Sequence, residues 1–507
     1  MQKVLTTDQM NSIDRATIAA GIPGLILMEN AAHAVVNYIA EHFAPVGSHR
    51  ITVVCGKGNN GGDGLAIARI LQTRFTPKSL EVILIADPAE LKGDAAANLK
   101  MLDAARIRRT HEFRKQYAES TLVIDAVLGT GLKGPASGKA LDAILAINSR
   151  FPHAKVIAVD IPSGMSGDSP VPPGTYVRDV DATVTFTAPK ICHALPSARR
   201  LMGDLHVAPI GTPPSLYQSD ATIQLALITP QSIAQILWPR VPDSNKGSYG
   251  HVLVIAGSFG KSGAAAMAGL AALRAGAGLV TVACPESVLA SVASFSPELM
   301  TEPRPDSASG VMALAEKLTL TAIGPGIGTD DATREMVRTV FANLNKPMVV
   351  DADALNCLAG TDWKSPGHPR ILTPHPGEMS RLTGLTIPEV QADRIGVARK
   401  LATERGVTVV LKGEGTLIAF PDGRVWINPT GSPAMATGGT GDILTGLTAG
   451  FAAQFPNYLD HATAAAVYLH GLAGEIAARH LGEQPVIATD LLRYLPEGIR
   501  AITNVPH

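Results

Sequence analysis

The feature that most constrains this chain of 507 residues is a regular alternation of short β-branched runs with Ala- and Gly-rich segments of helical period. Between residues 51 and 160, runs such as ITVVC and TLVID are separated by stretches whose apolar residues recur at helical spacing. Continuous apolar runs are typical of parallel strands that helices cover on both faces. The sequence therefore predicts an α/β protein built on parallel sheets.

A second series of the same kind begins near residue 230, with runs such as HVLVIAG and PMVVDADA. The stretch between the two series, GTPPSLYQSDATIQ, has turn-forming and polar residues without a sustained period, as a domain boundary does. A chain of this length is also too long for one ordinary core. We predict two three-layer α/β domains, a Rossmann-like one at 1–212 and a second at 230–507, joined by a linker at 213–229.

The composition argues against several classes of partner. With 43 basic and 44 acidic residues the formal charge is −1, and no basic run offers a surface for nucleic acid or for an anionic membrane. The four cysteines form no CxxC pair, which argues against a zinc site or a disulfide framework. The N-terminus lacks a secretion signal, and no apolar run is long enough to span a bilayer. We predict a cytoplasmic protein that binds small molecules, without nucleic-acid or membrane partners.

The stretch TGGTGDILTG, residues 437–446, surrounds one carboxylate, Asp442, with glycines at the start of an apolar helix. Free N–H groups at a helix N-terminus favour an anion such as a phosphoryl group. A carboxylate there either complements the helix dipole or acts as a base on a hydroxyl that attacks a phosphoryl group. Beside an anion site the second interpretation fits better, with the amides of Gly439, Thr440 and Gly441 stabilising the charge of the transferred oxygens.

Other candidate residues follow other strand-like runs of the second series. Lys412 precedes glycines that let the backbone approach a phosphate, although a Lys at such a turn is usually a solvated surface residue. His375 is fixed between two prolines, and is either structural or functional. Asp351 and Asp353 follow a further strand, where contacts to Mg²⁺ or phosphate and simple turn capping are both open. Ligands of open α/β sheets bind at the carboxyl ends of strands, so such residues are expected near one another.

Six motifs of the second series resemble, in order, those of the ADP- or ATP-dependent NAD(P)H-hydrate dehydratases, members of the ribokinase-like superfamily. They are GSFGKSGAAAMAGLAALRAGAGLVTV, GPGIG, DADALN, TPHPGE, LKGEGT and NPTGSPAMATGGTGDILTG. The resemblance implies a ribokinase-like second domain that uses Mg²⁺ with ADP or ATP. It implies that the hydrated nicotinamide nucleotide contacts Ala264, Gly326, His375 and Asp442. It implies that the adenine nucleotide is held by Lys412, Gly413, Glu414, Gly415, Thr416 and Gly441.

The implied reaction suits the Gly-rich helix start. Hydroxide is a poor leaving group, so phosphorylation of the stray ring hydroxyl followed by loss of phosphate would restore the dihydronicotinamide. Asp442 is the expected base. The order of the domains favours ADP over ATP, but no residue decides between them.

The first series has a Gly-rich turn of its own, CGKGNNGGDG, which follows a strand without the GxGxxG spacing of dinucleotide sites. Its Asn side chains offer amide oxygens, and Asp63 is an acid where a pyrophosphate loop has none, although turn capping is the alternative. Asp125 and Asp160 end two further strands, with Ser163 just beyond. Two carboxylates and a hydroxyl at one sheet edge suit a hard cation or proton transfer, whereas either Asp alone would more simply cap a helix.

Together the motifs CGKGNNGGDG, DAVLGTGLKG and VDIPSG resemble the NAD(P)H-hydrate epimerase domain. The resemblance implies that K⁺ is bound by Asn60, Asp125 and Ser163. It implies that the hydrated nucleotide contacts Asn59, Asn60, Gly61, Gly62, Asp63, Gly129, Thr130, Gly131, Leu132, Lys133, Gly134, Pro135 and Asp160.

The two implied activities complement each other. The hydrated carbon is bonded to both ring nitrogen and hydroxyl, so reversible loss of either bond scrambles its configuration, and Asp160 is the expected proton handler, with Lys133 a weaker candidate. A dehydratase specific for the S epimer would not repair the R epimer unless an epimerase converted it first. The expected substrates are NADH hydrate and NADPH hydrate, and the expected assembly is a homo-oligomer. The alternative is a ribokinase-like small-molecule kinase fused to a non-catalytic binding or scaffold domain.

Overall fold

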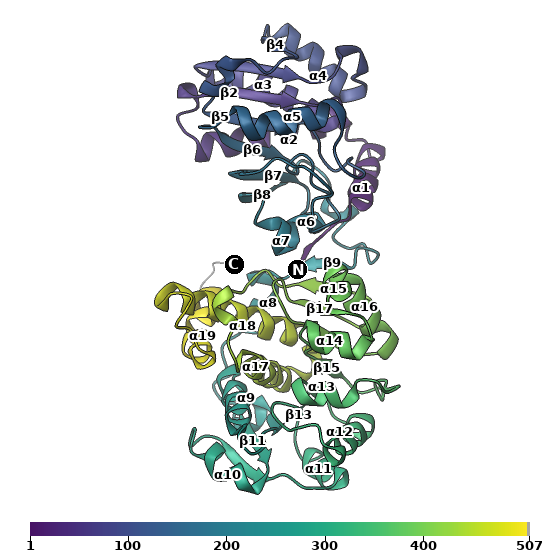
Figure 1. Ribbon diagram of the computed structural model, residues 1–507, viewed down its shortest axis with the longest axis vertical. Coiled ribbons are helices and arrows are strands. Elements are labelled where there is room, and N and C mark those ends of the chain that lie inside the picture. Colours follow the sequence, from purple (N-terminus) through teal and green to yellow (C-terminus); the bar gives the residue numbers. More distant parts are fainter. Residues whose placement is uncertain (504–507) are drawn as a thin grey trace. The chain divides into compact units, whose positions relative to one another are not determined.

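The chain folds into two units, Gln2–Ile223 and a second that begins at Gln224 (Figure 1). The computed structural model describes residues 1–503, except for the side chains of Lys115 and Gln116. The division between the units falls inside the segment 213–229. That segment is not structureless, because it contains a short helical turn at Pro214–Leu216 and the strand β9, Leu225–Leu227, of the second unit.

A parallel sheet of seven strands forms the centre of the first unit, in the order β4-β3-β2-β5-β6-β7-β8. Its strands are β2 (Arg50–Cys55), β3 (Ser79–Leu84), β4 (Arg109–Thr110), β5 (Leu122–Ala126), β6 (Lys155–Val159), β7 (Ala182–Phe186) and β8 (Asp204–Ala208). From β2 the chain moves outward to β3 and β4, and then returns to place β5 on the other side of β2. This reversal creates a crevice beyond the carboxyl ends of β2 and β5, the position where open α/β sheets bind ligands.

Helices cover both faces of this sheet, which explains the continuous apolar runs of the strands. Val53 and Cys55 of β2 lie in one core with the helices α2 (Gly24–His42), α3 (Asn59–Phe75) and α4 (Gly93–Ala104). Val54, between them in sequence, lies in the opposite core with α5 (Gly138–Arg150). Successive strand side chains point to opposite faces, so both must be apolar when both faces are covered. The short helices α6 (Ile191–Ala194) and α7 (Pro196–Arg199) precede β8, and α1 (Thr7–Ala19) precedes α2.

The sheet of the second unit runs through β9-β18-β17-β16-β15-β14-β13-β10-β11-β12. The further strands are β10 (His251–Ile255), β11 (Leu279–Cys284), β12 (Met300–Pro303), β13 (Leu320–Ile323), β14 (Met348–Val350), β15 (Arg370–Leu372), β16 (Thr408–Leu411), β17 (Leu417–Ala419) and β18 (Val425–Ile427). Its pairs from β16 to β12 are parallel, whereas β16, β17 and β18 pair antiparallel. The prediction of an α/β fold with parallel sheets is confirmed, and the antiparallel hairpin is an addition that the strand-like runs did not reveal.

The helices that bear on the second site are α9 (Ser262–Ala275), α13 (Ala352–Leu358), α14 (Pro376–Thr383), α16 (Arg394–Arg405), α17 (Thr440–Gln454) and α18 (Leu459–Leu481). The others are α8 (Pro230–Ala234), α10 (Glu286–Ala293), α11 (Ala308–Ala315), α12 (Asp331–Asn343), α15 (Ile387–Ala392) and α19 (Ala488–Thr503). Small residues let α17 lie directly on α9: a Cβ atom added at Gly446 would stand 2.1 Å from the carbonyl oxygen of Ala268. The Ala and Gly content of these helices therefore serves close packing within the unit.

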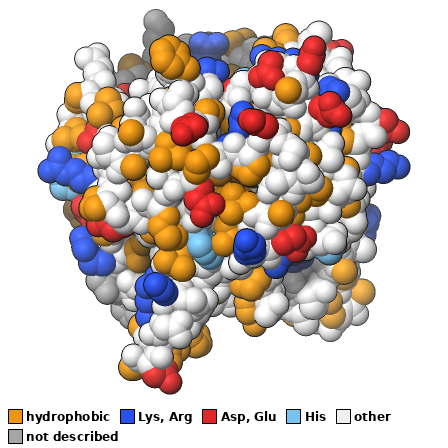
Figure 2. Space-filling model, turned by 90° about the horizontal axis from the view of Figure 1, so that it is seen from below, with side chains coloured by type: hydrophobic (Ala, Val, Ile, Leu, Met, Phe, Trp, Pro, Cys, Tyr) orange, Lys and Arg blue, Asp and Glu red, His pale blue; other side chains and the backbone are white. Residues whose placement is uncertain are grey.

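The surface seen in Figure 2 carries Lys and Arg side chains among Asp and Glu, with hydrophobic side chains scattered between them. No charge of one sign gathers on this face. Within residues 1–503, no single helix has the length and apolar composition needed to cross a membrane. One pair of helices bent by 120°, Thr7–Ala19 with Gly24–His42, meets those criteria of length and composition when taken together.

Two candidate active sites

The candidate site of the first unit is a cavity of about 440 Å³ beyond the carboxyl ends of β2, β5 and β6. Eight of the residues predicted for substrate binding line it: Asn59, Asn60, Asp63, Gly129, Thr130, Gly131, Leu132 and Asp160. Gly61 and Gly62 lie beneath it, because added Cβ atoms there would stand 2.0 Å from the Gly56 carbonyl oxygen and 2.8 Å from the Met28 sulfur. Lys133, Gly134 and Pro135 follow along the same loop but do not line the cavity.

The Asn and Asp residues of CGKGNNGGDG lie in the first turns of α3 rather than in a free loop. Asn60 is buried, and its Nδ2 atom has no hydrogen-bond partner within the described residues. Its Oδ1 atom lies close to Gly129, since a Cβ atom added there would be 3.2 Å away. Asp63 is buried too, and burial together with the charges of Asp160 and Asp14 raises its pKa well above the ordinary value. The start of α3 therefore presents to the crevice an amide and an acid, and among residues 1–503 no ion pair engages that acid.

Asp125 and Ser163, two of the predicted K⁺ ligands, are in direct contact. Ser163 donates from its backbone N to Asp125 Oδ2 at 2.8 Å and from its hydroxyl to Asp125 Oδ1 at 2.5 Å. Burial raises the pKa of Asp125 to about 6, although the Ser163 hydrogen bonds favour its ionised form. No ion pair joins Asp125 to a basic side chain in the described part of the chain. A buried carboxylate without a counter-charge is costly, so this position suits a bound cation.

Asp160 lies directly after β6 in a left-handed backbone conformation, with φ of +66°. Lys190 Nζ donates to its Oδ1 atom at 2.7 Å, and the Thr185 hydroxyl donates to the same atom at 2.9 Å. Burial alone would raise the pKa of Asp160, but the Lys190 ammonium outweighs it and holds that pKa below the ordinary value. Non-Gly residues rarely adopt this conformation, and those that do cluster at functional sites. The carboxylate is thus ionised and fixed at the cavity wall.

Two groups around Asp160 carried no signal in the sequence motifs. Lys190, only 1 % exposed, follows β7 and also lines the cavity. His193 accepts from the Lys190 backbone N at 2.9 Å through Nδ1 and donates through Nε2 to the Asp160 carbonyl oxygen, 3.1 Å away. Burial lowers the pKa of His193 to about 3, so its ring is neutral. A lone Lys or His after a strand looks ordinary in sequence, and only the fold brings both to Asp160.

The candidate site of the second unit begins at the N-terminus of α17. Gly439 precedes the helix with φ of +95°, and Asp442 lies in the first turn. A Cβ atom added at Gly438 would meet nothing within 4 Å, and one at Gly441 would lie 3.6 Å from Lys412 Nζ. Backbone amides are accessible here, as the anion-binding interpretation requires.

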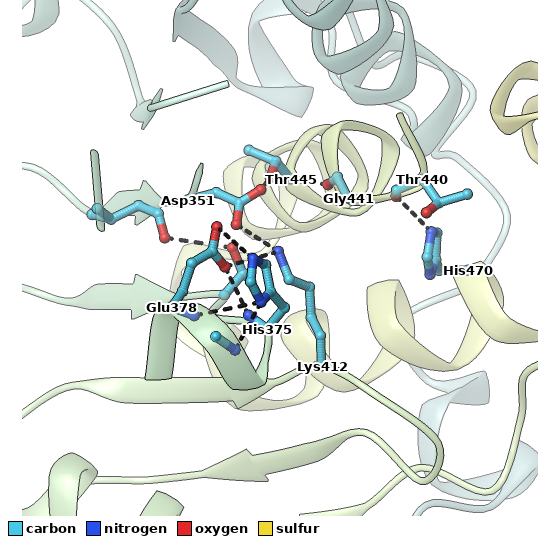
Figure 3. A network of polar contacts seen from close by, with 11 residues as sticks. Asp351, His375, Glu378, Lys412, Thr440, Gly441, Thr445 and His470 are labelled. Carbon is cyan, nitrogen blue, oxygen red and sulfur yellow. Dashed lines mark hydrogen bonds and ion pairs between the residues drawn. The ribbon is translucent and has the colours of Figure 1, made fainter. Parts of the chain in front are cut away.

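A network of polar groups surrounds this helix start (Figure 3). Asp351, directly after β14, accepts from Lys412 Nζ at 2.8 Å and from the Thr445 hydroxyl at 2.6 Å. Glu378 Oε2 lies 3.7 Å from Lys412 Nζ. His470 of α18 donates from Nε2 to the Thr440 carbonyl oxygen at 2.9 Å and so ties the first turn of α17 to α18. Residues of five elements thus meet at one point, namely the ends of β14 and β16 and the helices α14, α17 and α18.

Asp442 is the acid of this network without an ion pair in the described residues. Burial raises its pKa to about 6; the charges of Asp351 and Asp353 add to this effect, and Lys412 opposes it. A carboxyl group with a pKa near neutrality exchanges protons readily at physiological pH.

Asp351 and Asp353 have different hydrogen-bond partners within the described residues. Asp351 is occupied by Lys412 and Thr445, whereas Asp353 accepts from the Gly328 backbone N at 3.0 Å and from Lys261 Nζ at 3.3 Å. Residues 1–503 contain no group of three or more His, Cys, Asp or Glu side chains that could hold a metal ion. A metal ion bound beside Asp351 or Asp353 would need most of its ligands from groups other than these side chains.

His375 caps α14. Its Nδ1 atom accepts from the Gly377 backbone N at 2.9 Å, which leaves the hydrogen on Nε2, 3.5 Å from Glu378 Oε1. On another side of the site, a Cβ atom added at Gly326 would be 3.3 Å from the Cβ of Ala264. The structure therefore brings these two predicted substrate contacts together.

The KGEGT segment is partly turned into the site and partly exposed. Lys412 turns into the network, while Gly413 and Glu414 are exposed. Arg394 of α16 stabilises the segment by donating to the carbonyl oxygens of Glu414 at 2.5 Å and Lys412 at 3.3 Å. The Thr416 hydroxyl donates to the Gly413 carbonyl oxygen at 2.9 Å. Arg394 belongs to no motif and was missed in the sequence.

Comparisons with known proteins cover both units. A family model described as NAD(P)H-hydrate dehydratase matches residues 252–497, and one described as YjeF-related protein N-terminus matches residues 24–192. A protein of Moorella thermoacetica named bifunctional NAD(P)H-hydrate repair enzyme Nnr is 41% identical, over 98% of this chain and 96% of its own. Proteins of the same name from Coxiella burnetii (37% identical; 96% and 97% covered) and Escherichia coli (36%; 87% and 84%) are also similar.

Two solved structures resemble the second unit. The ADP/ATP-dependent NAD(P)H-hydrate dehydratase from Bacillus subtilis, co-crystallised with ATP/Mg²⁺, has a TM-score of 0.51 and 35% identity, covering 55% of this chain and 98% of its own. A ribokinase-like superfamily protein from Enterococcus faecalis has a TM-score of 0.50 and 28% identity, covering 56% and 98%. The prediction of a ribokinase-like second domain is confirmed.

Proposed function

Because this chain belongs to the family of bifunctional NAD(P)H-hydrate repair enzymes, we propose that its two units carry the two steps of that repair. The first unit interconverts the R and S epimers of NADH hydrate and NADPH hydrate. The second unit dehydrates the S epimer at the expense of ADP or ATP and so restores the reduced cofactor. The observation that carries the second activity is Asp442, an acid with a pKa near neutrality beside accessible amides at the N-terminus of α17.

The residues of the second unit fit an adenine nucleotide with Mg²⁺. Lys412 to Thr416 and Gly441 would hold the nucleotide, because a Cβ atom added at Gly441 would lie 3.6 Å from Lys412 Nζ, which brings a positive charge to the amides at the start of α17. Mg²⁺ usually binds through one or two carboxylates, several waters and the phosphates of the substrate, so the lack of an acidic cluster in residues 1–503 is no obstacle. The bound nucleotide supplies the phosphoryl group that turns the hydroxyl into a good leaving group. Asp442 would take the proton of that hydroxyl, and the amides at the helix start would stabilise the transferred oxygens.

The oxygen ligands of the first unit fit K⁺. Asp125 supplies a buried carboxylate that has no counter-charge among the described residues, and Ser163 and Asn60 add a hydroxyl and an amide oxygen. The bound cation would supply the missing positive charge beside the substrate cavity. The expected result is that KCl stabilises the first unit against heat more than choline chloride of equal ionic strength, and that Asp125→Asn abolishes this difference. Equal melting temperatures in the two salts for the unmodified chain would contradict the K⁺ site.

We also propose a Rossmann-like fold for the first unit, on the basis of its parallel strand order and its reversal between β2 and β5. The homo-oligomer and the cytoplasmic location stay predictions. Light scattering of the purified chain tests the former, and fractionation of cells tests the latter.

The proposed repair is tested by measuring which product forms. Purified chain, ADP or ATP, and a mixture of both NADH hydrate epimers should give full recovery of the near-ultraviolet absorbance of NADH. Recovery of only the S fraction would remove the epimerase. If no NADH is recovered and a phosphorylated product accumulates, the second unit is a small-molecule kinase instead.

A further inference from the structure

The cavity of the first unit contains an acid that belongs to none of the sequence motifs. Asp14 of α1 lines the cavity together with Asp160 and Lys190. Met10 and Ile18, one turn before and after Asp14, line it as well. Residues four apart share a face of a helix, so α1 forms one wall of the cavity and Asp14 stands in the middle of that wall.

The position of α1 is fixed at its N-terminal end. Thr7 donates from its backbone N to Asp168 Oδ1 at 2.8 Å, and the side chains of Thr6 and Gln9 form a capping box. Just before the helix, the Leu5 backbone N donates to the Pro189 carbonyl oxygen at 2.9 Å, next to Lys190. These contacts fix α1 beside the segment that carries Lys190, whose ammonium group faces Asp160.

The core fixes α1 along its length as well. Met10 and Ile13 pack with Leu5, Ala188 and Ile223 in a small core of their own. The helix is therefore not free to rotate, and Asp14 is held toward the cavity.

The carboxyl group of Asp14 is partly buried, and one of its oxygen atoms lacks the hydrogen-bond partner that a buried polar atom normally has. Its Oδ1 atom is buried and has no hydrogen-bond partner within the described residues. A buried polar atom without a partner costs free energy, unless a ligand or water supplies the missing bond. Since Asp14 lines the cavity, a polar group of the substrate is the partner that this geometry provides for.

Asp14 and Asp160, two of the acids that line the cavity, lose their protons over different pH ranges. Burial raises the pKa of Asp14 to about 6; Lys190 opposes that rise and the charge of Asp160 adds to it. The pKa of Asp160 is instead held below its ordinary value by Lys190. The charged groups that line the cavity around Asp14 are Lys57, Asp63, Asp94, Asp160 and Lys190. Two acids separated in this way are typical of an acid and a base that act on one substrate.

We propose that Asp14 is the proton donor that works with Asp160 in the interconversion of the hydrate epimers. The inference rests on the proposed epimerase function. Asp160 takes the proton of the hydroxyl, whose O–H electron pair becomes the second bond of a carbonyl group. The bond between that carbon and the ring nitrogen breaks, its electron pair goes to the nitrogen, and the nitrogen takes the proton of Asp14. Closure on the other face of the carbonyl reverses each transfer and returns both acids to their initial states.

The test follows the conversion of one enriched NADH hydrate epimer into the other by chromatography, with the full chain and without nucleotide. Asp14→Asn is expected to lower kcat by about 100-fold or more, with KM within a few fold of that of the unmodified chain. Asp8→Asn, a change of an exposed acid on the same helix, is the matched control and should leave the rate unchanged. Thermal unfolding and the nucleotide-dependent dehydration of the S epimer check that the variant is folded.

The pH profile and a conservative variant separate a proton donor from a structural residue. The unmodified chain should lose epimerase rate as the pH rises above about 6, because Asp14 must be protonated to donate, and Asp14→Asn should lack this decrease. Asp14→Glu, which keeps the acid, should recover part of the rate. A fully active Asp14→Asn, a profile unchanged by that substitution, or a Glu variant as slow as the Asn variant would overturn the inference. An inactive unmodified chain would instead overturn the proposed epimerase function.

Discussion

Asp351 and Lys412 form an ion pair at the centre of the second site, with 2.8 Å between Asp351 Oδ1 and Lys412 Nζ. Burial opposes both charges, yet Lys412 keeps the pKa of Asp351 below its ordinary value, and Asp351 with Glu378 keeps the pKa of Lys412 above its own. Both groups therefore stay charged around neutral pH. Neither of these two groups takes up a proton readily near neutral pH, whereas the pKa of Asp442 is raised to about 6.

The first prediction concerns Asp442. Asp442→Asn is expected to lower kcat for dehydration of the S epimer by about 10²- to 10⁴-fold, because a positioned general base contributes on that order. The epimerisation rate, measured without nucleotide, should stay unchanged, since it depends on the other unit. Nucleotide-dependent recovery of NADH absorbance at the full rate in this variant would exclude Asp442 as the base.

The second prediction concerns the pH dependence of dehydration. A base must be ionised to accept a proton, and the pKa of Asp442 is about 6. At saturating nucleotide and substrate, kcat should therefore decrease as the pH falls through about 6 and level off at higher pH. A rate that is constant between about pH 5 and about pH 8 would contradict the role of Asp442 in the slowest step.

The third prediction concerns stability. Lys412→Met leaves the buried Asp351 carboxylate without its counter-charge, which is expected to cost about 3–5 kcal/mol of unfolding free energy. Lys261→Met is the matched control, because its ion pair with Asp353 is half exposed and is expected to contribute about 0–1 kcal/mol. The three tryptophans, Trp238, Trp363 and Trp426, all lie in the second unit, so their fluorescence in a urea titration reports its unfolding. Equal losses of unfolding free energy in the two variants would show that the buried ion pair stabilises the unit no more than the half-exposed one does.

The fourth prediction concerns the packing of α17 on α9. Gly446→Ala would push a methyl group against the Ala268 carbonyl oxygen and is expected to lower the unfolding free energy by about 1–3 kcal/mol. Gly263→Ala adds the same methyl group to α9 where nothing lies within 4 Å, and it should be neutral or stabilising by up to about 1 kcal/mol. The same fluorescence titration measures both variants. Two unchanged midpoints would mean that the two helices can move apart without cost.

The sequence predicted those parts of the sites that follow directly after buried strands. Strands such as β5 and β6 are apolar on both faces, so a polar residue at their carboxyl end, as Asp125 or Asp160, is conspicuous. Residues that reach a site from a distant element have no such contrast. Asp14 lies in an ordinary amphipathic helix, and Lys190 is one Lys among many. Arg394 acts through backbone carbonyl oxygens, which leave no trace in the side-chain pattern.

The hairpin of β17 and β18 was also missed, for a related reason. Its strands have three residues each, too few for a period to be recognised. Its tight turn includes Gly423, with φ of +91°, which resembles any other Gly turn in the chain. Pairing partners, rather than local preference, decide the direction of such short strands.

The attachment of α1 beside Lys190 has a consequence for synthesis on the ribosome. Residues 5 and 190 form a strand-like bridge, so the earliest part of the chain waits for a much later one before it can dock. At a translation rate of about 5–20 residues per second, this delay is roughly 10–40 s. During that interval the segment 188–190, on which the first helix docks, has not been made, and a nascent chain arrested before residue 190 would lack one wall of its catalytic pocket.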